Sequence, residues 1–252
     1  MIFREDGSIQ YTLTRSKRAK HVRLKVSRTK GLEVVVPVTF KKAWLSPILE
    51  KRSEWIRKTA KRLELPDTVE NLSVIPSTIS LPVLGCEYAV KYVPIEEISR
   101  LIVEAQKIIR TSTGALSVEY KGTIFLPEEQ EQEVCIELLR LWLIRCGKET
   151  LPELLEDASE KVNIPFTKVQ VRLQKGRWGS CSSRGTISLN ARLLLLPPHL
   201  LNYILLHELA HVRHPNHSSA YWNYLQSLDP QALEYDAAMQ DAWRYIPLCF
   251  SM

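Results

Sequence analysis

Histidine is concentrated in one short stretch of this 252-residue chain. Four of its six histidines lie between residues 207 and 217, in the run HELAHVRHPNH. His207 and His211 are four residues apart in an apolar segment with helical periodicity, so their rings leave the same face of a helix one turn apart. Two imidazoles placed in this way can share one ion, and zinc accepts imidazole nitrogen at about 2.0–2.1 Å. The spacing therefore predicts a zinc site.

Glu208 follows the first of these histidines and gives the predicted site a reactive group. At 3.6 residues per turn, its side chain is turned by about 100° from that of His207. It can therefore reach a water on the metal without binding the metal itself. Zinc can lower the pKa of such a water to about 7, and a neighbouring carboxylate can accept the proton as the hydroxide attacks. This is the peptidase form of the HExxH motif, with Glu208 as the catalytic residue.

A third ligand is needed, and helix geometry separates the candidates. His214 lies seven residues beyond His207, about 10 Å along a straight helix, which is too far for one shared ion. His217 lies after a proline turn, where the chain can fold back, and we predict it as the third ligand. Glu234 and Asp236 remain alternatives, because zincins with a distal glutamate ligand exist. A structural zinc is also possible, although it would usually bring cysteines and a fourth protein ligand.

The motif needs a helix and neighbouring elements to position it. Pro197-Pro198 predicts the start of that helix, and His214-Pro215 predicts its end, because the residue before a proline is pushed out of the helical region. The alternating segment Thr186–Asn190 predicts a strand beside the site. An edge strand there can pair with an extended substrate backbone, whereas a buried structural strand is the alternative. Another helical region is predicted from Pro127 to about residue 159, with Gly147 and Pro152 as candidate breaks.

The first quarter of the chain is strongly basic. Residues 1–64 hold 17 Lys and Arg against 6 Asp and Glu, whereas the remainder holds 17 against 22. Alternating apolar residues predict short strands over 9–36, and an apolar stripe predicts one helix over about 41–64. The β-branched segment 73–125 predicts further strands. We therefore predict a basic, β-rich lobe at residues 1–125 and a second domain at 126–252.

Composition excludes several classes of protein. With 45% apolar and 25% charged residues, the chain is typical of globular proteins. It has no run of 18 apolar residues that would predict a membrane span, and its first residues lack the layout of a secretory signal. Its five cysteines are scattered and form no CxxC pair, which favours a reducing compartment. We expect a cytoplasmic protein with no membrane partner.

Motifs spread along the chain resemble those of one family. The run RWGSCSSRGTISLN at 177–190 is followed by PP at 197–198, HELAH at 207–211, NHS at 216–218 and YW at 221–222. Together they resemble the YgjP-like family of bacterial zinc metallohydrolases, which is related to the SprT-like and WLM zincins. The stretch from Tyr11 to Leu63 also resembles the amino-terminal region of that family. Tyr221 stands where the family usually has phenylalanine.

The resemblance implies an α+β fold with a zincin-like (minigluzincin) C-terminal domain that carries the HExxH helix, preceded by the basic β-rich region. It also implies Zn²⁺ as cofactor, held by His207, His211 and His217, with Glu208 as catalytic acid/base. The SprT-like and WLM relatives cleave proteins crosslinked to DNA. A nucleotide pyrophosphatase activity has been assigned to a member of the family.

Two further groups of residues are candidates for contacts with a substrate or partner. Near the motif, the candidate substrate-binding residues are Trp178, Ser188, Asn190 and Tyr221. In the basic region, the candidates for DNA or nucleotide phosphates are Arg15, Lys17, Arg18 and Lys20. A solvated strand face is the commoner explanation of such a basic strip. Few aromatic residues interleave it, so it does not indicate a platform for stacking single strands.

These observations support three hypotheses of function. The leading one is a zinc metallopeptidase that acts on a peptide or protein by Glu208-assisted attack of a zinc-bound water. The second keeps the metal site but hydrolyses a nucleoside triphosphate to release pyrophosphate; three histidines favour zinc over the magnesium that is common in such reactions. The third is a nucleic-acid-associated module in which the zinc is only structural.

Overall fold

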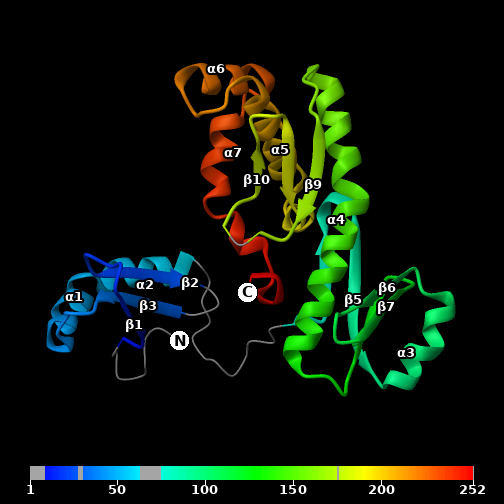
Figure 1. Ribbon diagram of the computed structural model, residues 1–252, viewed down its shortest axis with the longest axis horizontal. Helices are drawn as coiled ribbons and strands as arrows, with labels where there is room; N and C mark the ends of the chain where they lie inside the picture. The colour runs from blue at the N-terminus through cyan, green and yellow to red at the C-terminus, as the bar shows by residue number, and fades with distance from the viewer. Residues whose placement is uncertain (1–8, 28–30, 63–74, 175, 252) are drawn as a thin grey trace. The chain divides into compact units, whose positions relative to one another are not determined.

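The computed structural model describes residues 9–27, 31–62, 75–174 and 176–251. Its contacts divide the chain into two compact units, with the boundary between Val74 and Ile75. In Figure 1 the first unit runs from blue to cyan, and the second runs from cyan to red. We predict the boundary at residue 125 instead, and that position falls inside a strand of the second unit.

A three-stranded sheet with helices on one face forms the first unit (Figure 1). The strands are β1 (Thr12–Ser16), β2 (Arg23–Ser27) and β3 (Gly31–Pro37), in the order β1-β3-β2. Strand β3 is parallel to β1 and antiparallel to β2. The core of the unit combines Leu32, Val34 and Val36 from β3 with Leu45, Leu49 and Ile56 from the helices. The period-two strands predicted in this region are therefore confirmed.

The helical layer of this unit contains a bend. Instead of one helix over 41–64, the chain forms a 3-10 turn, η1 (Lys42–Trp44), and two helices, α1 (Leu45–Lys51) and α2 (Ser53–Arg62). Arg52 lies between the helices with φ −106° and ψ 4°. Its N–H donates to the carbonyl of Ile48 and its own carbonyl accepts from Ile56, so hydrogen bonds continue across the bend. The bend brings apolar residues of both helices into the same core.

The second unit begins with a five-stranded sheet, which confirms the β structure predicted for this segment. Its strands are β4 (Thr78–Leu81), β5 (Cys86–Val93), β6 (Lys107–Arg110), β7 (Leu116–Tyr120) and β8 (Thr123–Pro127), in the order β4-β5-β8-β7-β6. The 3-10 turns η3 (Pro82–Leu84) and η4 (Ile102–Glu104) and the helix α3 (Ile95–Leu101) connect them. Helix α3 is missing from our prediction, although Pro94 and the acids Glu96 and Glu97 are signals of a helix start.

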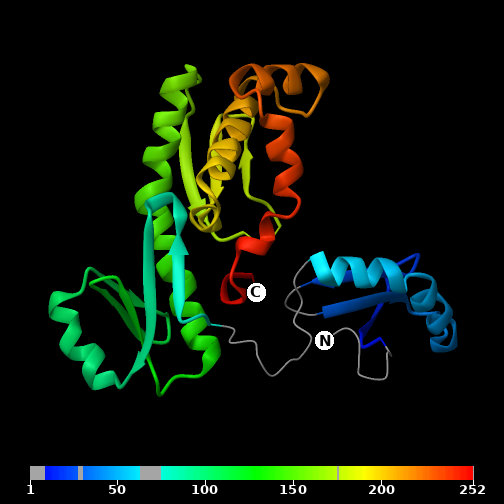
Figure 2. The same cartoon turned by 180° about the vertical axis from the view of Figure 1, so that it is seen from behind.

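The 31-residue helix α4 (Gln132–Val162) runs beside both sheets of this unit (Figures 1 and 2). It begins later than predicted, because Pro127 ends β8, and it continues through both predicted breaks. The indole of Trp142 donates a 2.6 Å hydrogen bond to the buried Glu119 of β7. Because the five-stranded sheet packs on α4 in this way, it belongs with the C-terminal part of the chain.

A smaller sheet and a set of helices complete the second unit. The strands are β9 (Lys168–Arg172), β10 (Gly179–Cys181) and β11 (Thr186–Asn190), in the order β10-β11-β9. The helical elements that follow are η5 (Ala191–Leu195), α5 (Pro198–Arg213), α6 (Ser219–Leu228), α7 (Ala232–Met239), η6 (Ala242–Tyr245) and α8 (Leu248–Ser251). None of the helices in the described ranges is long and apolar enough to span a membrane.

The order of this sheet decides between our two alternatives for Thr186–Asn190. It is not an edge strand, because β11 pairs antiparallel with β10 on one side and parallel with β9 on the other. A substrate backbone therefore cannot add to it. The edge on the side of α5 is β10, which contacts that helix.

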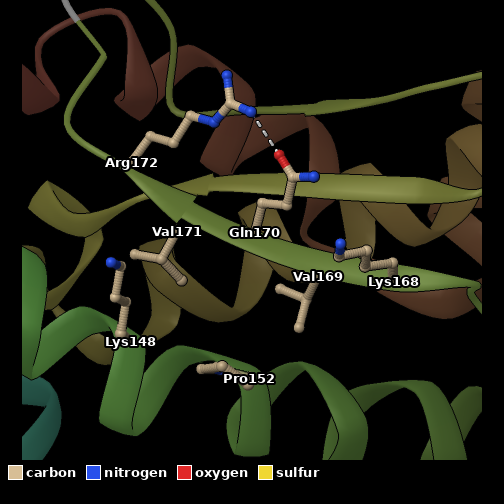
Figure 3. A pocket seen from close by; sticks show the side chains of 7 residues that line it. All are labelled: Lys148, Pro152, Lys168, Val169, Gln170, Val171 and Arg172. Atoms are coloured by element: carbon tan, nitrogen blue, oxygen red, sulfur yellow. Dashed lines mark hydrogen bonds between the residues drawn. The ribbon is translucent and has the colours of Figure 1, made fainter.

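The other edge, β9, borders a groove of about 430 Å³ between this strand and α4 (Figure 3). Its lining consists of Lys148, Pro152, Lys168, Val169, Gln170, Val171 and Arg172. The guanidinium of Arg172 donates to Gln170 Oε1 at 2.6 Å. No histidine of the 207–217 cluster lines this groove, so it is separate from the site described next.

Candidate metal centre

Helix α5 carries the first part of the site. It starts at Pro198, with Pro197 in an extended conformation before it, and ends at Arg213, with His214 at the C-cap in an extended conformation. Both ends agree with the proline signals in the sequence. The helix buries most of its residues, including Leu205, Leu206 and Leu209, while His207 and His211 are half-buried. The apolar packing thus fixes the side of the helix on which the two imidazoles lie.

A third imidazole reaches these two from beyond the end of the helix. The chain turns after His214, and Ser218 caps α6 by accepting a hydrogen bond from the backbone N–H of Tyr221. This turn places His217 Nε2 at 3.2 Å from His207 Nε2 and 3.1 Å from His211 Nε2. The remaining separation, between His207 Nε2 and His211 Nε2, is 3.2 Å. The three nitrogens therefore form a nearly equilateral triangle.

This triangle fits a tetrahedral metal ion. Two imidazole nitrogens that bind one zinc at about 2.05 Å with a tetrahedral angle lie about 3.3 Å apart. Among the described residues, His207, His211 and His217 are also the one group of three or more potential ligands whose donor atoms converge. The two alternatives are not part of it: Glu234 is exposed, and Asp236 instead accepts a hydrogen bond from Tyr203. His214 is likewise outside the cluster, with its ring against Tyr224.

Hydrogen bonds to the other ring nitrogens orient two of the imidazoles. The buried hydroxyl of Tyr203 donates to Asp236 Oδ1 at 2.8 Å, so it can only accept from His207 Nδ1, which lies 3.2 Å away. His211 Nδ1 donates to the carbonyl of His214 at 3.0 Å. With their protons on Nδ1, both rings direct a lone pair on Nε2 to the centre of the triangle.

Burial favours the neutral form of these rings. The pKa of His207 is lowered to about 3, mainly by burial and further by the charges that His211 and His217 would carry. The pKa of His211 is also lowered, again mainly by burial. Neutral imidazole is the form that binds a metal.

Glu208 lies beside the triangle in a restricted space. The residue is only 4% exposed, and its Oε2 atom is buried without a hydrogen-bond partner among the described residues. Burial raises the pKa of this carboxyl to about 8, although the charge of Arg177 opposes the shift. A buried carboxyl whose oxygen has no partner is unusual, and it points to a role in binding or chemistry.

Gly179 provides the space for this carboxyl. A Cβ atom at residue 179 would lie 2.8 Å from both Cγ and Cδ of Glu208 and closer still to Oε1. Strand β10 therefore approaches α5 at a point where only glycine fits without displacing the glutamate. The sequence contains the glycine but gives no sign of this contact, which depends on the packing of two distant segments.

Two of the four candidate substrate residues have structural roles instead, which corrects our expectation. Asn190 is fully buried, and its side-chain amide donates to the carbonyls of Gln174 and Arg177 at 2.9 and 2.8 Å. Tyr221 is also fully buried, with its ring stacked on His211 at 4.6 Å and its hydroxyl donating to the carbonyl of His207. Asn190 thus holds the loop before β10, and the ring of Tyr221 packs against the imidazole of His211.

The other two candidates are partly accessible. Ser188 is on the central strand, where its hydroxyl accepts from Gln174 Nε2 at 3.0 Å. Trp178 is half-buried and stacks on Trp243 at 4.2 Å, so its ring is held by the C-terminal segment. Cys181 is likewise half-buried, and burial raises the pKa of its thiol, which does not favour a reactive thiolate.

In the first unit, the four basic candidates are all exposed. Arg15 is on β1 and donates to the carbonyl of Val38, while Lys17, Arg18 and Lys20 lie in the turn after that strand. Their exposure leaves them accessible to a polyanion but does not identify one.

Two histidines and a glutamate on one helix, joined by a histidine from the next turn, are the arrangement of metal-dependent hydrolases. A family model described as "YgjP-like, metallopeptidase domain" matches residues 20–242. The chain belongs to this YgjP-like family, and its enzyme class is that of the zinc metallopeptidases.

Two solved structures are similar to part of the chain. One is the metallopeptidase zymogen abylysin of Pyrococcus abyssi, with 30% identity over 36% of this chain and 92% of that one, at a TM-score of 0.33. The other is the metallopeptidase zymogen jannalysin of Methanocaldococcus jannaschii, with 23% identity over 35% and 92%, at a TM-score of 0.32. A comparison with curated proteins found no match.

Proposed function

We propose that this protein hydrolyses peptide bonds at a zinc ion held by His207, His211 and His217, with Glu208 as the catalytic acid/base. The observation that carries the proposal is the triangle of Nε2 atoms, with sides of 3.1–3.2 Å, beside a buried carboxyl. In this reading, the second unit contains a zincin-like (minigluzincin) domain with α5 as its HExxH helix.

The imidazoles, the Glu208 carboxyl and strand β10 would have different roles in the reaction. The three imidazoles, two of them oriented through Nδ1, would bind the cation and leave one coordination position open. A bound zinc would polarise the scissile carbonyl and acidify a water molecule. The Glu208 carboxyl, kept ionised by the charge of the bound cation, would accept the proton of that water and then transfer it to the leaving amine. Edge strand β10 begins beside Glu208 and is the strand to which we assign an extended substrate.

A purely structural zinc is less well supported. Structural sites usually have four protein ligands, often cysteines, whereas three histidines and no cysteine converge in the described part of the chain. A structural site would also leave the burial of Glu208 without purpose. The five cysteines are free, and three of them are buried. These thiols fit a reducing compartment, and we propose the cytoplasm.

Two single variants, Glu208→Gln and His207→Ala, test this function. Glu208→Gln is nearly isosteric and should keep one zinc per chain while peptide hydrolysis falls by at least about a hundredfold, because only the proton acceptor is lost. His207→Ala should instead lose the zinc. Zinc content by mass spectrometry and cleavage of casein measure the two effects, and full activity in Glu208→Gln would remove this residue from the mechanism.

The same preparations distinguish peptide hydrolysis from the second candidate reaction, the release of pyrophosphate. A panel of nucleoside triphosphates, assayed for pyrophosphate release with the zinc-loaded protein, tests whether the site acts on phosphate anhydrides. Release of pyrophosphate that depends on Glu208, without cleavage of casein, would replace the peptidase assignment by the pyrophosphatase one.

A further inference from the structure

The helical layer of the first unit exposes two tryptophans. Trp44, at the end of η1, is 54% exposed, and Trp55, in the first turn of α2, is 42% exposed. Burying an aromatic ring normally stabilises a fold strongly. Two large rings left in water on adjoining helices therefore indicate a surface that contacts something else.

Cationic side chains accompany both rings. The ammonium of Lys41 lies 5.7 Å from the ring centroid of Trp44. Lys51 and Lys58 are exposed; Lys51 ends α1 just before the bend, and Lys58 lies one turn after Trp55 on α2. Lys58 is paired with Glu54, but both side chains are about 80% exposed, so the pair is weak and open to competition. Over residues 41–61 the exposed charges are Lys41, Lys42, Lys51, Arg52, Arg57, Lys58 and Lys61 against Glu50 and Glu54.

The tryptophans are also close enough along the chain for one ligand to reach both. Phe40 is almost buried and meets the ring of Trp44 edge-on, with centroids 5.7 Å apart, so this indole is supported from within the unit. Eleven residues separate the two tryptophans, which corresponds to no more than about 17 Å along helical backbone. A strand of a few nucleotides can span such a distance.

We propose that the surface formed by Trp44, Lys51, Trp55 and Lys58 binds single-stranded nucleic acid. Bases of any sequence can stack on the indoles, and the lysines can neutralise the phosphates. The basic strip at residues 15–20 has few aromatic residues, which is why the sequence does not indicate a stacking platform there. The platform lies on the helices of the same unit instead.

An anionic membrane is the competing partner, but the burial pattern disfavours it. Helices that lie on membranes insert a broad apolar face into the lipid. Here Leu45, Leu49 and Ile56 of α1 and α2 are buried in the core of the unit, and Ile48 and Ala60 are partly buried against it. What remains exposed is two indoles among charges, which suits stacking better than insertion.

Fluorescence anisotropy of a labelled oligothymidylate, with the full-length protein at low and at physiological salt, tests the proposal. Trp44→Ala and Trp55→Ala should each weaken binding by about five- to a hundredfold, whereas the Phe variants should retain most of it. Lys51→Gln combined with Lys58→Gln should weaken binding and reduce its dependence on salt.

The control is a pair of similar residues in the second unit. Lys91 and Tyr92 on β5 are both exposed, Tyr92 by 47%, so Lys91→Gln with Tyr92→Ala should leave the affinity unchanged. Circular dichroism establishes that each variant is folded. Absence of binding at low salt, or wild-type affinity in both Trp→Ala variants, would overturn the proposal. Binding to phosphatidylserine vesicles without binding to the oligonucleotide would overturn it in favour of a membrane.

Discussion

Replacing Gly179 by alanine should inactivate the enzyme without removing its metal. The added Cβ atom would lie 2.8 Å from Cγ and Cδ of Glu208, whereas carbon atoms in contact normally lie about 3.5–4.0 Å apart. The carboxyl must therefore move by roughly 1 Å. A displacement of this size at a reacting group can lower the rate by about a hundredfold.

The expected result is a loss in kcat with little change in zinc content. Gly179 has no positive φ, so alanine fits its backbone and acts through the contact with the glutamate. The three atoms nearest to the new methyl group all belong to Glu208. Steady-state peptidase kinetics, with zinc measured on the same preparation, give the two quantities. Overpacking should also reduce the free energy of unfolding by about 1–3 kcal/mol.

The loop before β10 offers a matched control. A Cβ atom at Gly176 would meet nothing within 4 Å, so Gly176→Ala should retain wild-type kcat. In the Glu208→Gln background, Gly179→Ala should cause no additional loss, because both changes act on one group. Wild-type kcat in Gly179→Ala, or full additivity of the two changes, would refute the link between this glycine and the catalytic carboxyl.

Other parts of the site and core make separate predictions. Tyr203→Phe removes the hydroxyl that orients His207 and should lower zinc affinity about 10- to 100-fold in a chelator titration; unchanged affinity would show that the hydroxyl has no such role. Trp142→Phe removes the indole donor from the buried Glu119 and leaves Lys107, 3.5 Å away, as its partner, so urea unfolding should show a loss of about 2–3 kcal/mol, and a loss near zero would contradict this. Removal of zinc should lower the Tm, since a ligand at 1,000 times its Kd adds about 4 kcal/mol. His217→Ala should respond much less to the chelator, and an equal response would count against it as a ligand.

The helix of the site and its histidines could be predicted because their signals are local. Proline fixes both ends of α5, and the four-residue spacing of His207 and His211 determines their common face. His217 follows from the length of the turn, which limits where the chain can return. Such features depend on a few neighbouring residues and not on the rest of the fold.

The roles of residues around the motif could not be predicted in the same way. Thr186–Asn190 has the alternation of a strand, but alternation does not tell which strands pair with it. In the structure it is the central strand β11, and β9 is its parallel neighbour. Tyr221 and Asn190 are polar residues near a motif, yet packing buries both completely. Burial of this kind arises from contacts between distant segments.

The domain boundary shows the same limit. The basic charge of residues 1–64 and the β pattern of 73–125 suggest one lobe, because composition records what a segment contains and not where it packs. The hydrogen bond between Trp142 and Glu119 joins the five-stranded sheet to α4, and this contact assigns the sheet to the second unit.

Anomalous diffraction at the zinc edge, from crystals of the zinc-loaded protein, tests the central claim most directly. We predict a single strong peak about 2.0–2.1 Å from the Nε2 atoms of His207, His211 and His217, with no fourth protein ligand and with Glu208 close by but not bound. A peak held by other residues, a fourth protein ligand, or three empty imidazoles in the presence of excess zinc would contradict the account.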